Sequence, residues 1–250
     1  MKFVFDLDGT ICFKGIPVSE VILTRLERLT QTGHEVLFAS ARPVRDMLPV
    51  LHQRFHHYTL IGGNGSLIFK DGKSIYTHAF SPEQRNFLLQ LLEDHQVTYL
   101  IDSDWDYAYT GSEHHPIKAN IDLLKLATIR SVSDLSQIVK ILILTAHDED
   151  QLFQKLNALD VVIHHHTYTH EIDISPSGIH KWSALQWLGV EEGNFIAFGN
   201  DVNDISMFQM AQHAVMVGHH DRLAPYASVS ISSDEDSIIS HIDYIVNNMK

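Results

Sequence analysis

A short apolar run that ends in two carboxylates opens the chain. Phe3-Val4-Phe5 is followed directly by Asp6-Leu7-Asp8 and then by Gly9-Thr10. Apolar runs of this length form the buried strands of parallel sheets, and open α/β sheets place their sites at the carboxyl ends of such strands. Two neighbouring carboxylates repel each other unless a cation or a shared proton compensates. The run therefore predicts an α/β sheet with a divalent cation and phosphate chemistry at its edge.

Strand and helix patterns alternate over the first eighty residues and again after residue 177. The expected elements are strand 2–6, helix 18–32, strand 35–40, helix 43–54, strand 59–61, a hairpin of 66–69 and 74–76, helix 180–188, strand 194–198, helix 203–212, strand 214–217 and a last helix from about 234. Alternation of this kind is typical of a parallel sheet with right-handed crossovers. We therefore predict a Rossmann-like parallel sheet core, of fold class α/β, formed by residues 1–80 and 178–250.

Residues 81–177 interrupt that alternation. The expected elements here are a helix from Pro82, strand material in 97–109, strand 138–145, helix 148–159 and one or two strands in 161–174. Helix and strand units with antiparallel character predict a separate α+β module inserted in the core, which we call the inserted module. The segment 175–178, Ser-Pro-Ser-Gly, is the expected hinge back to the core.

Composition limits the partners. The formal net charge of −13 provides no basic surface for nucleic acid, whereas a small phosphorylated substrate depends only on local charge. No apolar run approaches the ~18 residues of a membrane span. Cys12 is the only cysteine, so an intramolecular disulfide is impossible and a reducing compartment is favoured. We expect a cytoplasmic protein without a membrane partner, and either a monomer or a homodimer is compatible with the sequence.

Four polar segments in a fixed order resemble the motifs of the haloacid dehalogenase superfamily. They are Asp6 to Thr10, Ser40 after the second strand, Lys181 at a helix start, and the run Gly199 to Asp204. The insertion between the second and third motifs follows a Gly-Asn-Gly turn and resembles the type IIB cap of the Cof-like phosphatases. The resemblance covers essentially the whole chain. It implies the haloacid dehalogenase fold with an inserted α+β cap domain, residues 81–177, that sets substrate specificity.

The first motif suits phosphoryl transfer, which needs a nucleophile, charge neutralisation and a proton for the leaving group. Asp6 is the candidate nucleophile, forming an aspartyl-phosphate, and Asp8 is the candidate general acid and then base. Thr10 can cap the following turn, and we place it with the phosphate-binding residues. The resemblance adds that Asp6 and the main-chain carbonyl of Asp8 hold Mg²⁺. The alternative reading is a strand that merely ends in a turn.

Three further side chains are candidates for phosphate and substrate contacts. Ser40 is either a helix cap or a phosphate-binding hydroxyl, and the resemblance favours the second role. Arg42 is either a substrate contact or a surface residue. Asn64, in the Gly-rich turn, is either a turn residue or a substrate contact. Lys181, which the resemblance makes a catalytic residue, would offset the charge of an aspartate and a phosphate.

The fourth motif departs from the family pattern, which usually has an aspartate ligand for Mg²⁺ where Asn200 stands. An amide oxygen also suits a hard cation, so we favour Asn200 as a direct ligand, with Asp201 and Asp204 as supporting residues. The alternative is that Asp201 turns inward and binds the metal. Asn203 is expected to contact the phosphate or the nucleophile loop.

We therefore predict a Mg²⁺-dependent phosphatase that acts on a small phosphorylated metabolite, such as a sugar phosphate. A phosphomutase and a catalytically weakened phosphometabolite sensor are the alternatives, and Asn200 is the reason for considering the second. Specificity residues are expected in the inserted module, among residues 102–109, His114, His115 and residues 164–170. A zinc site in the run of three histidines is disfavoured, because alternating strand residues face opposite sides.

Overall fold

The computed structural model describes residues 1–165 and 171–248. Its core is an eight-stranded sheet of order β13-β12-β11-β1-β2-β3-β4-β5. The strands are β1 (Lys2–Phe5), β2 (Glu35–Ala39), β3 (Thr59–Gly62), β4 (Leu67–Lys70), β5 (Lys73–Thr77), β11 (Phe195–Gly199), β12 (His213–Val217) and β13 (Val229–Ile231). Neighbours from β13 to β3 pair in parallel, whereas β4 and β5 add an antiparallel hairpin at the edge.

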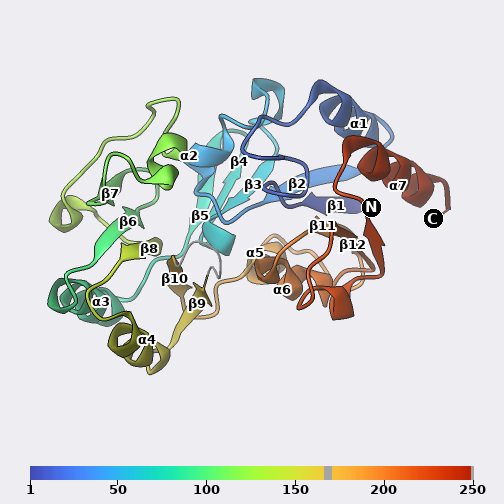
Figure 1. The fold of residues 1–250 in the computed structure, drawn as a ribbon. Coiled ribbons are helices and arrows are strands. Elements are labelled where there is room, and N and C mark those ends of the chain that lie inside the picture. Colours follow the sequence, from blue (N-terminus) through green and yellow to red (C-terminus); the bar gives the residue numbers. More distant parts are fainter. Residues whose placement is uncertain (166–170, 249–250) are drawn as a thin grey trace.

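Helices cover both faces of this sheet (Figure 1). On one face lie α1 (Glu20–Gln31) and α7 (Glu235–Asn248), and on the other α5 (Lys181–Trp187) and α6 (Ile205–Phe208). Successive residues of β1 serve the two layers, since Phe3 and Phe5 pack toward α1 and α7 while Val4 packs toward α5 and α6. A central strand buried on both faces must be apolar throughout, which explains its sequence.

The inserted module forms a second, five-stranded sheet of order β7-β6-β8-β10-β9, with every neighbouring pair antiparallel. Its elements are α3 (Pro82–Asp94), β6 (Thr98–Asp102), β7 (Tyr107–Tyr109), β8 (Lys140–Thr145), α4 (Glu149–Asn157), β9 (Val161–His165) and β10 (Ile172–Pro176). Apolar side chains of α3 and α4 pack with alternate residues of the sheet, among them Ile141, Ile143 and Ile174. The opposite face of the sheet is turned toward the core.

Several predicted elements differ from the observed ones. The helix expected at 43–54 is only α2 (Val44–Met47) plus a 3₁₀ turn, because Pro49 has no N–H for the helical ladder. The helix expected at 203–212 shrinks to α6, since the main chains of Met210 and Gln212 bond to Gly193 and Phe195 instead. The predicted hinge is shorter, because Ser175 and Pro176 belong to β10 and pair with β9. The edge strand β13 was not predicted.

Candidate active site

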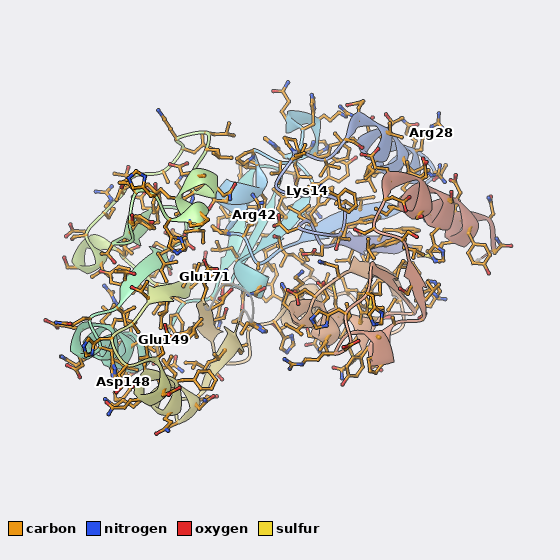
Figure 2. The ribbon with its side chains drawn as sticks, viewed as in Figure 1. Lys14, Arg28, Arg42, Asp148, Glu149 and Glu171 are labelled. Atoms are coloured by element: carbon orange, nitrogen blue, oxygen red, sulfur yellow. The ribbon has the colours of Figure 1, made fainter. Side chains whose placement is uncertain are left out.

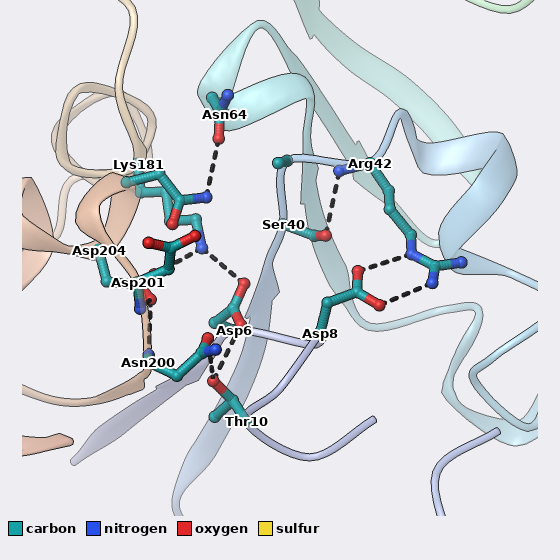
Figure 3. A network of polar contacts seen from close by, with 12 residues as sticks. Asp6, Asp8, Thr10, Ser40, Arg42, Asn64, Lys181, Asn200, Asp201 and Asp204 are labelled. Atoms are coloured by element: carbon teal, nitrogen blue, oxygen red, sulfur yellow. Dashed lines mark hydrogen bonds and ion pairs between the residues drawn. The ribbon is translucent and has the colours of Figure 1, made fainter. Parts of the chain in front are cut away.

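The carboxyl ends of three adjacent parallel strands bring the motif residues together. Strand β1 lies between β2 and β11, and Phe5 is in register with Phe38 on one side and Phe198 on the other. Asp6 follows β1 directly, and its N–H donates to the Phe198 carbonyl at 3.0 Å. Figure 3 shows side chains from all three strand ends converging on Asp6. This convergence is what the sequence pattern predicted.

Asp6, Lys181 and Asp204 form a fully buried charge network. Lys181 Nζ donates to Asp6 Oδ1 at 2.7 Å and to Asp204 Oδ1 at 2.6 Å. The second oxygen of Asp204 accepts the main-chain N–H groups of Asn200 and Asp201, at 2.8 and 3.1 Å. Lys181 opens α5 and is wholly inaccessible to solvent. Asp204 therefore fixes both the lysine and the fourth-motif loop.

The network carries more negative than positive charge. Burial raises the pKa of Asp6 to about 7, and the attraction of Lys181 opposes this rise while Asp204 adds to it. Burial alone would lower the pKa of Lys181, but the adjacent Asp204 and Asp6 raise it, so the ammonium is retained. One ammonium thus faces two buried carboxylates. A further cation beside Asp6 would balance the charge.

The Asn200 amide faces oxygens of Asp6, Asp8 and Thr10. One of its two polar atoms lies 3.1 Å from Thr10 Oγ1, 2.9 Å from the main-chain oxygen of Asp8 and 3.2 Å from Asp6 Oδ2. If that atom is the nitrogen, it donates to these oxygens. If it is the oxygen, it can accept from the Thr10 hydroxyl, but it faces the oxygens of Asp8 and Asp6, and a cation between these oxygens would relieve their repulsion. Neighbouring ligands of octahedral Mg²⁺ lie about 3.0 Å apart, given bonds of roughly 2.1 Å, so these oxygens fit the ion.

Asp201 lies differently from Asn200. Its Oδ1 accepts the N–H of Val202 at 2.6 Å and lies 3.4 Å from Nε2 of His220, and its side chain is half-exposed. It caps the turn that follows. Of the two alternatives for a metal ligand, this geometry favours Asn200. Gly9, with φ of +79°, supports the same arrangement, because a Cβ there would collide with the Asn200 amide.

Asp8 is held by Arg42 at the mouth of the site. Arg42 Nε and Nη2 donate to the two carboxylate oxygens of Asp8 at 2.7 and 2.6 Å (Figure 3). The Arg42 N–H donates to Ser40 Oγ at 3.1 Å, so the Ser40 hydroxyl stabilises this turn. The side chain of Asp8 is 46% exposed, whereas Asp6 is buried. The two acids thus differ in environment, as their different predicted roles require.

Asn64 connects the fourth motif with the inserted module. Asn203 Nδ2 donates to Asn64 Oδ1 at 3.1 Å, and Asn64 Nδ2 lies 3.4 Å from Asp173 Oδ2 in β10. Asn64 is buried and adopts a left-handed backbone with φ of 58°, a conformation that asparagine tolerates. Lys140 continues the chain of contacts, with Nζ 2.8 Å from Asp173 Oδ2 and 2.8 Å from the Ala41 carbonyl.

A cavity of about 240 Å³ lies between the core and the inserted module. It is lined by Ala41, Arg42, Pro43, Asp46, Leu100, Asp102, Ile117, Asn120, Ile121, Lys140, Leu142, Glu171 and Asp173. Asp102 was among the predicted specificity residues, whereas His114 and His115 do not line the cavity. Residues 166–170 of the predicted histidine-rich segment lie outside the described part of the chain. Lys140 and Asp173 were not predicted.

Comparison with known proteins identifies the family of the chain. The family model described as haloacid dehalogenase-like hydrolase matches residues 3–242. The chain belongs to this family. The predicted recognition and the α/β fold with an inserted module are therefore confirmed, and the predicted enzyme class, a phosphatase, is confirmed at the level of the family.

Relatives of this haloacid dehalogenase-like hydrolase are named as phosphatases. The 5-amino-6-(5-phospho-D-ribitylamino)uracil phosphatase of Bacillus subtilis is 25% identical over 247 residues, covering 92% of each chain. The HMP-PP phosphatase of Klebsiella pneumoniae is 25% identical over 242 residues, covering 86% of this chain and 83% of that protein.

Solved structures share the fold at lower identity. A Streptococcus mutans protein superposes with a TM-score of 0.81 at 19% identity and covers 99% of both chains. A subclass IIB sugar phosphatase of the superfamily gives 0.79 at 19% identity and covers 98% of both chains. Within the described residues, no helix combines the length and apolar character that a membrane crossing requires.

Proposed function

We propose that this hydrolase is a Mg²⁺-dependent phosphatase that releases phosphate from a small phosphorylated metabolite through an aspartyl-phosphate on Asp6. The observation that carries the proposal is the environment of Asp6: its two oxygens are oriented by Lys181 and Thr10, at 2.7 and 2.9 Å. A carboxylate fixed in this way at a strand end is a suitable nucleophile for in-line attack.

The proposed reaction uses these side chains in two steps. Asp6 attacks phosphorus, and the bond from phosphorus to the leaving oxygen breaks as Asp8 gives that oxygen a proton. Asp8 then takes a proton from water, the water oxygen bonds to phosphorus, and the bond to Asp6 breaks. Lys181 offsets the negative charge on Asp6 and on the phosphoryl oxygens. The Ser40 hydroxyl donates a hydrogen bond to the phosphoryl oxygens.

Asp6, the Asp8 carbonyl and Asn200 are the residues that would hold Mg²⁺. The ion would supply charge neutralisation for the phosphoryl oxygens. Asn203 and Asn64 are hydrogen-bonded to each other at this site, which suits contact with substrate. The proposal also includes the division of the chain into a core and a specificity cap at residues 81–177. It further includes a cytoplasmic location and no nucleic-acid partner.

A phosphate-release screen over a panel of metabolites tests the proposal. We expect release from at least one sugar phosphate or related phosphoester, loss of release with EDTA, and its recovery with Mg²⁺. Asp6→Asn is the control and should abolish release. Phosphate that remains on the substrate as an isomeric ester would indicate a phosphomutase, and binding without any release would indicate a sensor.

A further inference from the structure

The cavity between the two modules has a polar roof built by one face of a sheet. Leu100 and Asp102 of β6, Lys140 and Leu142 of β8, and Asp173 of β10 all line it. They share a face because strand residues alternate and the strands are in register, with Asp173 opposite Leu142 and Asp102 opposite Lys140. The floor is the core loop that carries Arg42, and the Arg42 side chain connects the cavity lining with Asp8.

Figure 2 labels Arg42, which precedes α2 in the core, and Glu171, which precedes β10 in the inserted module. Both line the cavity. A group that leaves phosphorus beside Asp8 would therefore extend into the space between them.

Asp173 has one oxygen without a hydrogen-bond partner. Its Oδ2 is contacted by Lys140 and Asn64, but within residues 1–165 and 171–248 no donor reaches Oδ1. The residue is 1% exposed, so water does not compensate freely. Buried carboxylate oxygens are nearly always hydrogen-bonded, because leaving one unpaired forfeits its hydration. Because Oδ1 is itself covered, a donor on a bound ligand would reach it through a small shift of the Asp173 side chain and would then supply what is missing.

The charge around the cavity is negative on balance. Asp46, Asp102, Glu171 and Asp173 line it, against Arg42 and Lys140. Arg42 is already paired with Asp8, and the buried Arg45 below the cavity pairs with Asp46 and Asp102. An excess of carboxylates in a partly desolvated space favours a cationic donor over a neutral one and disfavours an anion.

We propose that this cavity binds the leaving group of the substrate and that Asp173 selects a leaving group bearing an amine. The inference rests on the proposed phosphatase function and narrows its substrate class. The amine donates to Asp173 Oδ1, while the phosphoryl group lies at Asp6. Asp173 is thus a specificity-determining residue, and a leaving group that carries a carboxylate is rejected.

Binding to the Asp6→Asn variant tests this selection without turnover. Calorimetry with glucosamine 6-phosphate and glucose 6-phosphate compares an amine with a hydroxyl at one position. We expect roughly tenfold tighter binding of the amine, as a charge-assisted hydrogen bond provides. Adding Asp173→Asn should remove this preference, and 3-phosphoglycerate should bind more weakly than either sugar.

Lys140→Met in the Asp6→Asn background is the matched variant. It removes the positive partner of Asp173 and should increase the preference for the amine. If Asp173 and Lys140 had a merely structural role, both variants would change the amine preference in the same direction. Changes of opposite sign therefore support selection by Asp173. If Asp173→Asn does not fold, the amine preference of Lys140→Met alone decides the proposal. Equal binding of the two sugars, or a preference that both variants leave unchanged, would overturn the proposal.

Turnover of p-nitrophenyl phosphate by the otherwise unaltered enzyme separates this inference from the proposed function. That substrate has no amine, so its hydrolysis depends on Asp6 and Asp8 but not on selection by Asp173. Hydrolysis without an amine preference in binding overturns the cavity assignment alone. An amine preference in an enzyme that hydrolyses no phosphoester overturns the phosphatase function and leaves the binding assignment supported.

Discussion

Arg42 and Asp8 form a two-pronged ion pair, with both carboxylate oxygens of Asp8 within 2.7 Å of guanidinium nitrogens. The pair joins the loop after β2 to the loop after β1, and it directs the candidate acid toward the cavity. Arg42 is also fixed by the Asp46 carbonyl, which accepts from Nη1 at 3.2 Å. The pair therefore fixes the orientation of the Asp8 side chain, which is the proposed acid and base.

Replacement of Arg42 should reduce activity more than stability. In Arg42→Met, Asp8 loses its orientation, and kcat/KM should fall by roughly 10–100-fold, within the range that general acid catalysis contributes. The free energy of unfolding should change by less than about 1 kcal/mol, because Asp8 is half-exposed. Phosphate release and urea denaturation measure the two quantities. Arg42→Lys, which retains the charge without the fork, should lie between the two proteins in activity.

Lys181 should be essential to the stability of the fold. Lys181→Met leaves Asp6 and Asp204 buried without their shared cation, which should cost about 3–5 kcal/mol in urea denaturation with EDTA present. The double variant Lys181→Met/Asp204→Asn removes one of the stranded charges and should recover part of that loss. A double variant less stable than the single one would contradict this account of the network.

Asn200 should control the affinity for Mg²⁺. Asn200→Asp adds a second carboxylate beside Asp6, and calorimetry should show roughly tenfold tighter Mg²⁺ binding, because affinity for a hard cation rises with the charge of its ligands. Asp201→Ala is the control, and its effect should be much smaller since that side chain caps the next turn. Unchanged affinity in Asn200→Asp together with abolished binding in Asp201→Ala would assign the metal to Asp201.

A histidine pair should make the protein sensitive to acid. His213 and His241 stack with ring centres 5.5 Å apart, and burial lowers the pKa of both below the usual histidine value of about 6.5. The unfolded chain therefore takes up protons first as the pH falls, so the stability that the neutral pair contributes is present above about pH 6.5 and is lost below it. Melting temperatures between pH 7.5 and 5.5 should fall less in His241→Phe. Parallel curves for the two proteins would refute this.

The site could largely be predicted because parallel strands end at one edge. Asp6, Ser40 and Asn200 each follow an apolar run, so strand order alone brings them together. The ion pair of Arg42 with Asp8 could not be predicted, since it depends on the path of two loops. The sequence leaves Asn200 and Asp201 as alternative metal ligands, because it does not show that the Asp201 side chain caps the turn that follows it.

The cavity could not be predicted for a different reason. Lys140 and Asp173 are polar residues in apolar strands, a pattern that normally indicates a face open to water. Here that face is turned toward the core, and only the placement of the inserted module reveals this. The burial of Arg45 could not be predicted for the same reason. Arg45 lies in a short helix of the core, yet it is buried in an ion pair with Asp102 of β6.

The central claim is that Asp6 carries the phosphoryl group during turnover. Acid quenching of the enzyme in the presence of a hydrolysed substrate, followed by peptide mass spectrometry, tests it directly. We predict one phosphoryl group on the peptide containing Asp6, labile to hydroxylamine and absent from Asp6→Asn. Release of phosphate with no phosphorylated peptide, or with the phosphoryl group on another residue, would contradict the claim.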